Sequence, residues 1–231
     1  MVLQNLAQLQ SRLPEGVLLE LGKVHDATSA LYAEEQALVA KAVKSRRHEF
    51  SSARALAHQL LRQLGIPSAP LLCLEDRSPD WPPAILGSLS HSRKQCAALL
   101  ARKSESLIGL GVDVEDHRPL KQNLFAEILT HAEIVNMQAA LPEQEHAAHA
   151  LAIFGIKEAV FKAMHALGNR GLGFHAMEVD VLKDKSRPII SPLTDLQQRL
   201  PQGCTPEVHH LRQDEILLSV VLLHRPTSPA S

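Results

Sequence analysis

The sequence predicts an α+β fold in which each half of the chain pairs helices with a few short strands. Two observations support this prediction. Residues 34–64 and 117–167 are mostly helical in composition, and short apolar or alternating runs lie between and after them. These runs predict strands at residues 17–21, 96–101, 108–115, 177–182, 207–211 and 216–223.

A polar segment at residues 102–106 separates the two groups of elements. We expect it to be the boundary between an N-terminal half at residues 1–104 and a C-terminal half at residues 105–224. The remaining residues, 225–231, are expected to form a disordered tail, because they are polar and terminal.

Composition excludes several classes of protein. The formal net charge of −1 argues against a nucleic-acid binder that works by counterion release. No apolar stretch reaches the roughly 18 residues that a membrane span needs, and no signal peptide precedes the first turn. Three cysteines, at positions 73, 96 and 204, lack the spacing of a zinc site or a disulfide framework. We therefore expect a cytoplasmic protein.

The first helical region has clear end signals and one basic face. Thr28 is expected to cap a helix, and Gly65 with the proline at 67 ends the helical stretch. Arg54 and His58 follow Arg47 at offsets of seven and eleven residues, which places all three on one helix face. Such a face is either a solvated basic surface or a set of phosphate contacts, and the spacing does not distinguish them.

A loop-rich segment follows, and it leads into a run of serine and histidine at residues 87–92. Trp81 in the loop is expected to be a packing anchor. The run does not form a nucleophile elbow, because His91 occupies the place of the second glycine of that motif. The small hydroxyl residues, with Ser90 and His91 adjacent, suit hydrogen bonding to a phosphate at least as well.

The strand at residues 108–115 presents two carboxylates on one face. Period-2 alternation sends Ile108, Leu110, Val112 and Val114 to the core and the intervening residues to the other side. On that side lie Asp113 and Glu115, with Gly109 and Gly111 leaving room for something large. Like charges on one face repel unless a cation or a basic group lies between them, and Mg²⁺ is the divalent ion that commonly joins carboxylates to phosphates. An Asp-x-Glu pair alone is common on protein surfaces.

The helix at residues 151–167 carries charged residues in two different places. Its apolar stripe runs from Ile153 to Leu167, and Glu158 and Lys162 lie away from it, one turn apart. That pair is either a surface salt bridge or part of a site. Lys157 lies only about 40° from the stripe centre, so it should snorkel or reach into a pocket. His146 and His149 are expected to be ordinary surface residues of the preceding helix.

Two of these segments resemble the signature motifs of 4'-phosphopantetheinyl transferases. They are Gly111-Val112-Asp113-Val114-Glu115 and Phe154-Gly155-Ile156-Lys157-Glu158-Ala159-Val160-Phe161-Lys162. Upstream, Trp81-Pro82 with residues 87–92, and Arg47-His48-Glu49-Phe50 with Arg54, resemble the enterobactin-synthetase component D-like branch of the Sfp-type enzymes. The resemblance covers about residues 45–182. Gly155 stands where the family usually has a small hydroxyl or thiol residue.

The resemblance implies a fold and a reaction. The fold would have two similar halves related by a pseudo-twofold axis, each with a small antiparallel sheet on a long helix, an active site at their interface, and a monomeric state. The reaction would move 4'-phosphopantetheine from coenzyme A to a serine of an apo carrier domain of a peptide, polyketide or fatty acid synthase, including siderophore synthetases. Adenosine 3',5'-bisphosphate would leave. A magnesium-dependent nucleotide or coenzyme A hydrolase and a non-catalytic coenzyme A-binding relative are the alternatives.

The resemblance also implies roles for individual residues. Asp113, Glu115 and Glu158 would hold Mg²⁺, while Lys157 and Lys162 would stabilise phosphate charge. The nucleotide end of coenzyme A would meet Arg47, Arg54, Ser90 and His91. Asp113, Glu158 and Lys162 would be the catalytic residues, and either Glu158 or a metal-bound water would activate the carrier serine.

Overall fold

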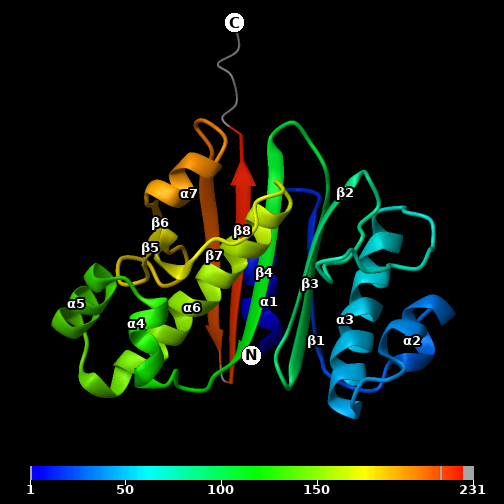
Figure 1. The fold of residues 1–231 in the computed structure, drawn as a ribbon, viewed down its shortest axis with the longest axis horizontal. Helices are drawn as coiled ribbons and strands as arrows, with labels where there is room; N and C mark the ends of the chain where they lie inside the picture. Colours follow the sequence, from blue (N-terminus) through cyan, green and yellow to red (C-terminus); the bar gives the residue numbers. More distant parts are fainter. Residues whose placement is uncertain (1, 214, 226–231) are drawn as a thin grey trace, which may run out of the picture.

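The computed structural model describes residues 2–213 and 215–225 of the chain (Figure 1). Two three-stranded antiparallel sheets form its centre. The N-terminal sheet has the order β1 (Val17–Lys23), β3 (Gln95–Arg102), β2 (Ile85–His91), and the C-terminal sheet has the order β4 (Leu107–Asp116), β8 (Ile216–His224), β7 (Thr205–Gln213). Each half therefore consists of a strand, then a long helix, then a hairpin. The second strand of the hairpin pairs with the strand that precedes the helix. This confirms the predicted α+β fold with two similar halves.

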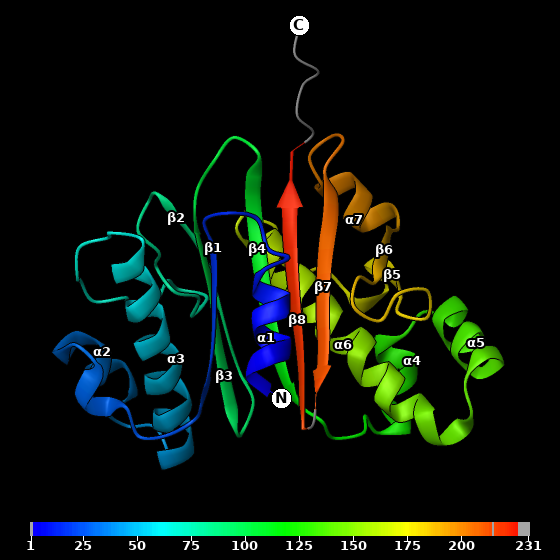
Figure 2. The same cartoon turned by 180° about the vertical axis from the view of Figure 1, so that it is seen from behind.

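The two long helices cover the outer faces of the two sheets. Helix α3 (Lys44–Gln63) packs on β1 and β3, whereas α6 (Glu143–His165) packs on β4 and β8. The inner faces share one apolar core that includes Leu19, Leu99, Val112 and Val220. Helix α1 (Val2–Gln10) closes this core from behind, as Figure 2 shows. The halves are joined along β2 and β4, where Ser88 Oγ accepts a hydrogen bond from the Val112 amide over 3.0 Å.

The smaller elements decorate this frame. In the N-terminal half they are a 3₁₀ turn at Thr28–Ala30 and α2 (Ala33–Val39). In the C-terminal half they are 3₁₀ turns at Gln122–Leu124 and Phe174–Ala176, α4 (Phe125–Ile128), α5 (His131–Ala140), β5 (Met177–Asp180), β6 (Ile189–Pro192) and α7 (Thr194–Arg199). Among the helices of the described residues, none combines the length and the apolar character that crossing a membrane requires.

Several helix boundaries differ from the prediction. The region 34–64 holds two helices, because the chain turns at residues 40–43 between α2 and α3. Tyr32, and not Thr28, is the N-cap residue of α2. The predicted helix at 151–167 is the second part of one continuous helix that starts at Glu143. Pro142 provides its N-cap, so the two predicted helical segments join without a break.

Strand β4 departs from simple alternation at its start. A register shift between Leu107 and Gly109 turns Ile108 to the α6 side, away from the core that holds Leu110. The two glycines make room for the helix and not for a ligand. A Cβ atom at Gly111 would lie 1.9 Å from the Ala159 carbonyl oxygen of α6. This close approach brings the polar side of α6 next to the carboxylates of β4.

The structure contains three elements that the sequence does not predict, namely α1, β6 and α7. Strand β2 also runs through residues for which the sequence predicts no strand. The expected tail begins beyond the last strand. The Arg225 amide donates to the Ser106 carbonyl over 2.7 Å, and residues 226–231 of the predicted tail lie outside the described residues.

Candidate active site

The charged residues of β4 and α6 meet at the seam between the halves. Lys162 Nζ donates to Asp113 Oδ1 over 2.6 Å, to Ser90 Oγ over 3.0 Å and to the Val112 carbonyl over 3.1 Å. Ser90 Oγ donates in turn to Asp113 Oδ1 over 2.9 Å and accepts from the Val114 amide. Strand β2 thus places a hydroxyl from the N-terminal half directly in the acidic site of the C-terminal half.

Two further carboxylates lie close enough to feel this charge. Burial, and then the charge of Asp113, raises the pKa of Glu115 to about 7, although Lys162 opposes the shift. Burial also raises the pKa of Glu158, and Asp113 adds to the shift while Lys162 again opposes it. Three carboxylates therefore share one positive charge, so the cluster has an excess of negative charge at its centre.

One carboxylate oxygen in this cluster has no partner. Within residues 2–213 and 215–225, Asp113 Oδ2 is buried and accepts no hydrogen bond. It faces Gly155 of α6, where an added Cβ atom would lie 3.4 Å from it. The same described residues hold no group of three His, Cys, Asp or Glu side chains already arranged around one point. The Oδ1 atom accepts from Lys162 and Ser90, which leaves Oδ2 as the carboxylate oxygen without a partner among the described residues.

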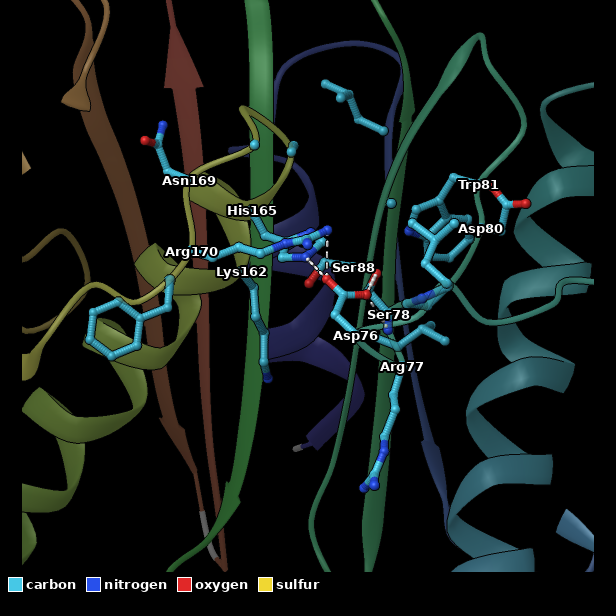
Figure 3. Close-up of a pocket in the computed structure, with 18 of the residues that line it drawn as sticks. Asp76, Arg77, Ser78, Asp80, Trp81, Ser88, Lys162, His165, Asn169 and Arg170 are labelled. Carbon is cyan, nitrogen blue, oxygen red and sulfur yellow. Dashed lines mark hydrogen bonds and ion pairs between the residues drawn. The ribbon is translucent and has the colours of Figure 1, made fainter. Parts of the chain in front are cut away.

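A cleft of about 880 Å³ opens on one side of Lys162 (Figure 3). The N-terminal half lines it with Trp81 and Ser88, and the C-terminal half with Phe161 and His165. The Trp81 ring packs on Gly87 of β2. The contact is so close that a Cβ atom at Gly87 would lie 2.4 Å from the Trp81 Cε2 atom. The expectation that Trp81 is a packing anchor agrees with this contact, and its ring also forms one wall of the cleft.

A hydrogen bond and an ion pair join the two halves across this cleft. His165 Nε2 lies 2.6 Å from Asp76 Oδ2, and Arg170 Nη2 lies 2.8 Å from the same oxygen. Ser78 Oγ donates to the other oxygen of Asp76. Figure 3 shows these side chains together at the mouth of the cleft. We call the group of Asp76, His165 and Arg170 the clasp.

A smaller cleft of about 320 Å³ lies on the other side of the acidic cluster. Its walls include Glu49, His91 and Arg93 from the N-terminal half and Glu115 and Arg118 from the C-terminal half. His91 Nε2 lies 2.6 Å from Arg46 Nη1. Burial lowers the pKa of His91, and the charge of Glu49 opposes that shift. The cluster of Asp113, Glu115, Glu158 and Lys162 therefore stands between two clefts.

The basic residues of α3 separate into exposed and enclosed positions. Arg47 is exposed, whereas Arg54 is only 3% exposed and packs its guanidinium 4.7 Å from the centre of the Phe50 ring. Arg54 Nη2 also donates to Cys73 Sγ. Arg54 is thus surrounded by protein and gains no opening toward either cleft. Arg46, which lies outside the predicted basic face, contacts His91.

Lys157 is completely enclosed on the far side of α6. Its Nζ atom donates to Glu133 Oε2 over 2.7 Å and to the Ile128 carbonyl over 2.9 Å. Glu133 also accepts from the backbone amides of Thr130 and Val179. The predicted pocket for this lysine exists, but it is filled by a carboxylate of α5. This geometry gives Lys157 a role in joining α5, α6 and β5, and it does not support a phosphate contact.

Comparison with known proteins identifies the family of the chain. A model described as 4'-phosphopantetheinyl transferase N-terminal domain matches residues 34–101, and one described as 4'-phosphopantetheinyl transferase superfamily matches residues 109–217. The chain is 32% identical over 173 residues to 4'-phosphopantetheinyl transferase Npt of Nocardia iowensis, which covers 74% of this chain and 75% of that protein. The chain belongs to the 4'-phosphopantetheinyl transferase superfamily.

Two other relatives match over a smaller share of their length. The chain is 33% identical to 4'-phosphopantetheinyl transferase Svp of Streptomyces mobaraensis, over 69% of this chain and 64% of that protein. It is 34% identical to PptT of Mycobacterium tuberculosis, over 66% of each chain. The chain thus spans slightly less than two thirds of these two proteins. The narrower resemblance to the enterobactin-synthetase component D-like branch stays a prediction.

Solved structures show more distant similarity. Holo-ACP-synthase from Plasmodium yoelii aligns with a TM-score of 0.43 and 15% identity over 54% of this chain and 100% of that chain. A holo-(acyl-carrier-protein) synthase from Bacillus anthracis in complex with CoA (3',5'-ADP) aligns with a TM-score of 0.39 and 21% identity over 52% of this chain and 97% of that chain.

Proposed function

We propose that the protein transfers 4'-phosphopantetheine from coenzyme A to a serine of an apo carrier domain and releases adenosine 3',5'-bisphosphate. One observation carries the proposal. Three carboxylates and Lys162 lie together at the seam of the halves, with a cleft on each side. A ligand with a charged centre and two long arms fits this arrangement better than a compact nucleotide does.

The acidic cluster fits a divalent cation. Asp113, Glu115 and Glu158 provide only oxygen atoms, which are the ligands that Mg²⁺ prefers. The unpartnered Oδ2 atom of Asp113 and the raised pKa of Glu115 both indicate that the cluster is short of positive charge. When bound there, Mg²⁺ would supply positive charge against the pyrophosphate oxygens of coenzyme A.

The chain's own residues would do the remaining work. Lys162 would place its ammonium group against the phosphate that accumulates charge as the leaving group departs. Ser90 would hold Lys162 and Asp113 in register from the other half. Glu158 would accept the proton of the carrier serine, since burial raises its pKa toward the range in which a general base is effective at neutral pH.

The two clefts would bind the two ends of coenzyme A. The smaller cleft, with His91 in its wall and Arg46 next to His91, would hold the nucleotide end through charged hydrogen bonds to phosphate. Arg47, which is exposed and follows Arg46 in α3, would add positive charge. The larger cleft, with the Trp81 and Phe161 rings, would hold the pantetheine arm. Arg54 and Lys157 would act indirectly, by fixing α3 and α6.

The proposal also covers partners and setting. The carrier domains would belong to peptide, polyketide or fatty acid synthases. Because one chain supplies both walls of each cleft, the protein would act as a monomer. Its three cysteines are all unpaired, which supports a reducing cytoplasm as its location.

The test is a transfer assay with a panel of apo carrier domains, coenzyme A and Mg²⁺, read by intact-protein mass. At least one carrier should gain the mass of a phosphopantetheine group. Asp113→Asn should lower kcat/KM by about 10²–10³-fold, the range seen when one preorganised electrostatic group is removed from an active site. No mass gain on any carrier would contradict the proposal, and release of adenosine 3',5'-bisphosphate without a carrier would indicate a hydrolase instead.

A matched control lies on the same helix. His146 of α6 is half-buried and its Nε2 atom pairs with the Leu141 carbonyl, far along the helix from the acidic cluster. His146→Ala should therefore keep the wild-type kcat/KM. An equal loss in both variants would indicate a general effect on folding and not removal of a site residue.

A further inference from the structure

A cavity of about 340 Å³ lies in the C-terminal half, apart from the two clefts, and we call it the side cavity. Its walls come from α6, from the loop between β5 and β6, and from β7. Ala152 of α6 lines the side cavity, whereas the preceding residue, Leu151, lines the smaller cleft beside β4. Successive helix residues point about 100° apart, and β8 lies between β4 and β7. The side cavity is therefore separate from the acidic cluster.

The loop that forms one wall of the side cavity is held by hydrogen bonds. Asp184 Oδ1 accepts from Ser186 Oγ over 2.8 Å and from the backbone amides of Ser186 and Arg187. The His210 amide of β7 donates to the Ser186 carbonyl over 2.9 Å, which attaches the loop to the edge of the sheet. The cavity is thus already formed in the folded chain, with a volume at the lower end of the range for small-molecule pockets.

His210 is the most buried polar residue of the side cavity, with only 6% exposed. Burial and the nearby charge of Arg212 lower the pKa of His210 to about 4, so the ring is neutral at pH 7. Its Nδ1 atom lies 3.0 Å from Ser219 Oγ, and this is the only hydrogen bond of that buried hydroxyl among the described residues. A buried hydroxyl that donates to nothing is costly, so Ser219 donates to Nδ1. The ring proton then lies on Nε2.

The side cavity thus meets ring nitrogens that the protein does not use. His210 Nε2 has no hydrogen-bond partner among the described residues, and it is not one of their fully enclosed unpartnered atoms, so it is accessible from the cavity. His149 of α6 is half-buried and likewise forms no hydrogen bond within the described part of the chain. Burial lowers the pKa of His149, although the charge of Asp180 opposes the shift. That carboxylate is itself paired with Lys183 over 3.1 Å.

Two cations stand at the rim of the side cavity. Lys185 and Arg212 are exposed, and neither forms an ion pair with another described residue. Among the described residues that line the cavity, Glu145 is the only carboxylate. Because the two histidines are neutral, the wall carries an excess of positive charge, which repels a metal ion and attracts an anion.

We propose that the side cavity is a second binding site of the protein and takes a small molecule that carries a phosphate group. Lys185 and Arg212 donate charged hydrogen bonds to the phosphate from the rim, and His210 Nε2 donates from the floor. Donors on the loop, on β7 and on α6 suit the four oxygens of a tetrahedral phosphate better than the two oxygens of a planar carboxylate. Apolar residues such as Val181 and Leu211 cover the rest of the molecule.

The experiment titrates the folded wild-type protein, labelled with ¹⁵N-histidine, with phenyl phosphate and follows the histidine rings by long-range proton–nitrogen correlation spectra. The His210 ring should show the proton on Nε2, and the signals of His210 and His149 should shift to saturation. Benzoate, a planar carboxylate with the same apolar ring, should bind more weakly. Neither coenzyme A nor a carrier domain is present, so the result is independent of the transfer assay.

Three variants locate the phosphate. Lys185→Gln and Arg212→Gln should each raise the dissociation constant of phenyl phosphate about tenfold, the loss expected for one charge-assisted hydrogen bond. Arg187→Gln is the matched control, because Arg187 is exposed on the same loop but pairs with Glu207 over 3.7 Å. It should keep the wild-type dissociation constant. A saturable shift at His91 alone would place the phosphate in the smaller cleft and overturn the inference, as would shifts that never saturate, equal binding of benzoate or an equal loss in Arg187→Gln.

Discussion

Three side chains of helix α6, Lys157, Lys162 and His165, are each paired with a carboxylate at nearly the same distance but in a different environment. Lys157 lies 2.7 Å from Glu133, and their side chains are 0% and 4% exposed. Lys162 lies 2.6 Å from Asp113, with 29% and 6% exposed. His165 lies 2.6 Å from Asp76, with 34% and 23% exposed. The distance between partners therefore does not identify the pair that belongs to a site.

What separates these pairs is how completely their atoms are satisfied. Glu133 accepts from Lys157 and from two backbone amides, so both of its oxygens are used. Asp113 leaves one buried oxygen without a partner and stands beside two carboxylates with raised pKa values. A closed network stabilises a fold, whereas an open network at a cleft can bind a ligand.

The largest effect in this comparison should follow from breaking the closed pair. Lys157→Met would leave the Glu133 carboxylate buried without its cation, and we expect the free energy of unfolding to fall by about 3–5 kcal/mol. Urea unfolding measures this change. Adding Glu133→Gln should recover part of the loss, because the amide removes the buried charge and keeps one acceptor for a backbone amide. A stable Lys157→Met variant that has lost transfer would instead place Lys157 with the substrate.

Periodicity predicted where these side chains lie, but not what they meet. Alternation along residues 108–115 predicted that Asp113 and Glu115 share a face, and helix geometry predicted that Lys157 turns toward the interior. The partner of Lys157 is Glu133, 24 positions away in the chain. Neither rule carries information about such distant contacts.

The predictions that differ from the structure have similar physical causes. The sequence predicts that Gly109 and Gly111 leave room for a ligand, but the backbone of α6 passes within contact distance of both. A strand pattern carries no information about this contact. Arg47 and Arg54 do share a face of α3, but beyond the first turn that face is covered by α2 and by the loop at residues 72–73, so Arg54 is enclosed while Arg47 is exposed. The sequence does not predict strand β2, because its glycine and serines have low strand propensity. Pairing with β3 overrides this low propensity.

His210 lies in the same row of the C-terminal sheet as Asp113, two strands away. Its burial can be tested through the pH dependence of stability. The pKa of His210 is about 4 in the folded protein, below the ordinary value of 6.5, because of burial. A lowered pKa means that the unfolded chain binds the proton first, so its contribution to stability is present above pH 6.5 and is lost as the pH falls toward 4. The full contribution is about 3 kcal/mol.

The measurement is the unfolding free energy of wild type and His210→Gln between pH 4 and 8. The difference between the two curves should change over the window from 6.5 to 4 and be constant above it, because glutamine does not titrate. Taking the difference removes the common contribution of other histidines with lowered pKa values, such as His149 and His209. Parallel curves through the whole range would show that His210 titrates normally and is not enclosed.

The clasp should give the smallest effect, because its charges are the most exposed of the three pairs. Exposed ion pairs contribute little to stability, and salt screens them. Asp76→Asn should therefore leave the global unfolding free energy nearly unchanged. Its effect should be local, in the turn at residues 74–78, where the Arg77 amide donates to the Leu74 carbonyl and the Leu74 amide to the Ser78 carbonyl.

Hydrogen exchange of these two amides measures that local effect. Both should exchange faster in Asp76→Asn, since the ion pairs with His165 and Arg170 are the contacts that hold the turn to the other half. High salt should bring the wild-type rates toward those of the variant. Glu75→Gln, a neighbouring exposed carboxylate, should exchange like the wild type. If instead both variants exchange equally, the turn is held by its own backbone, and the third pair on α6 contributes nothing to closing the cleft.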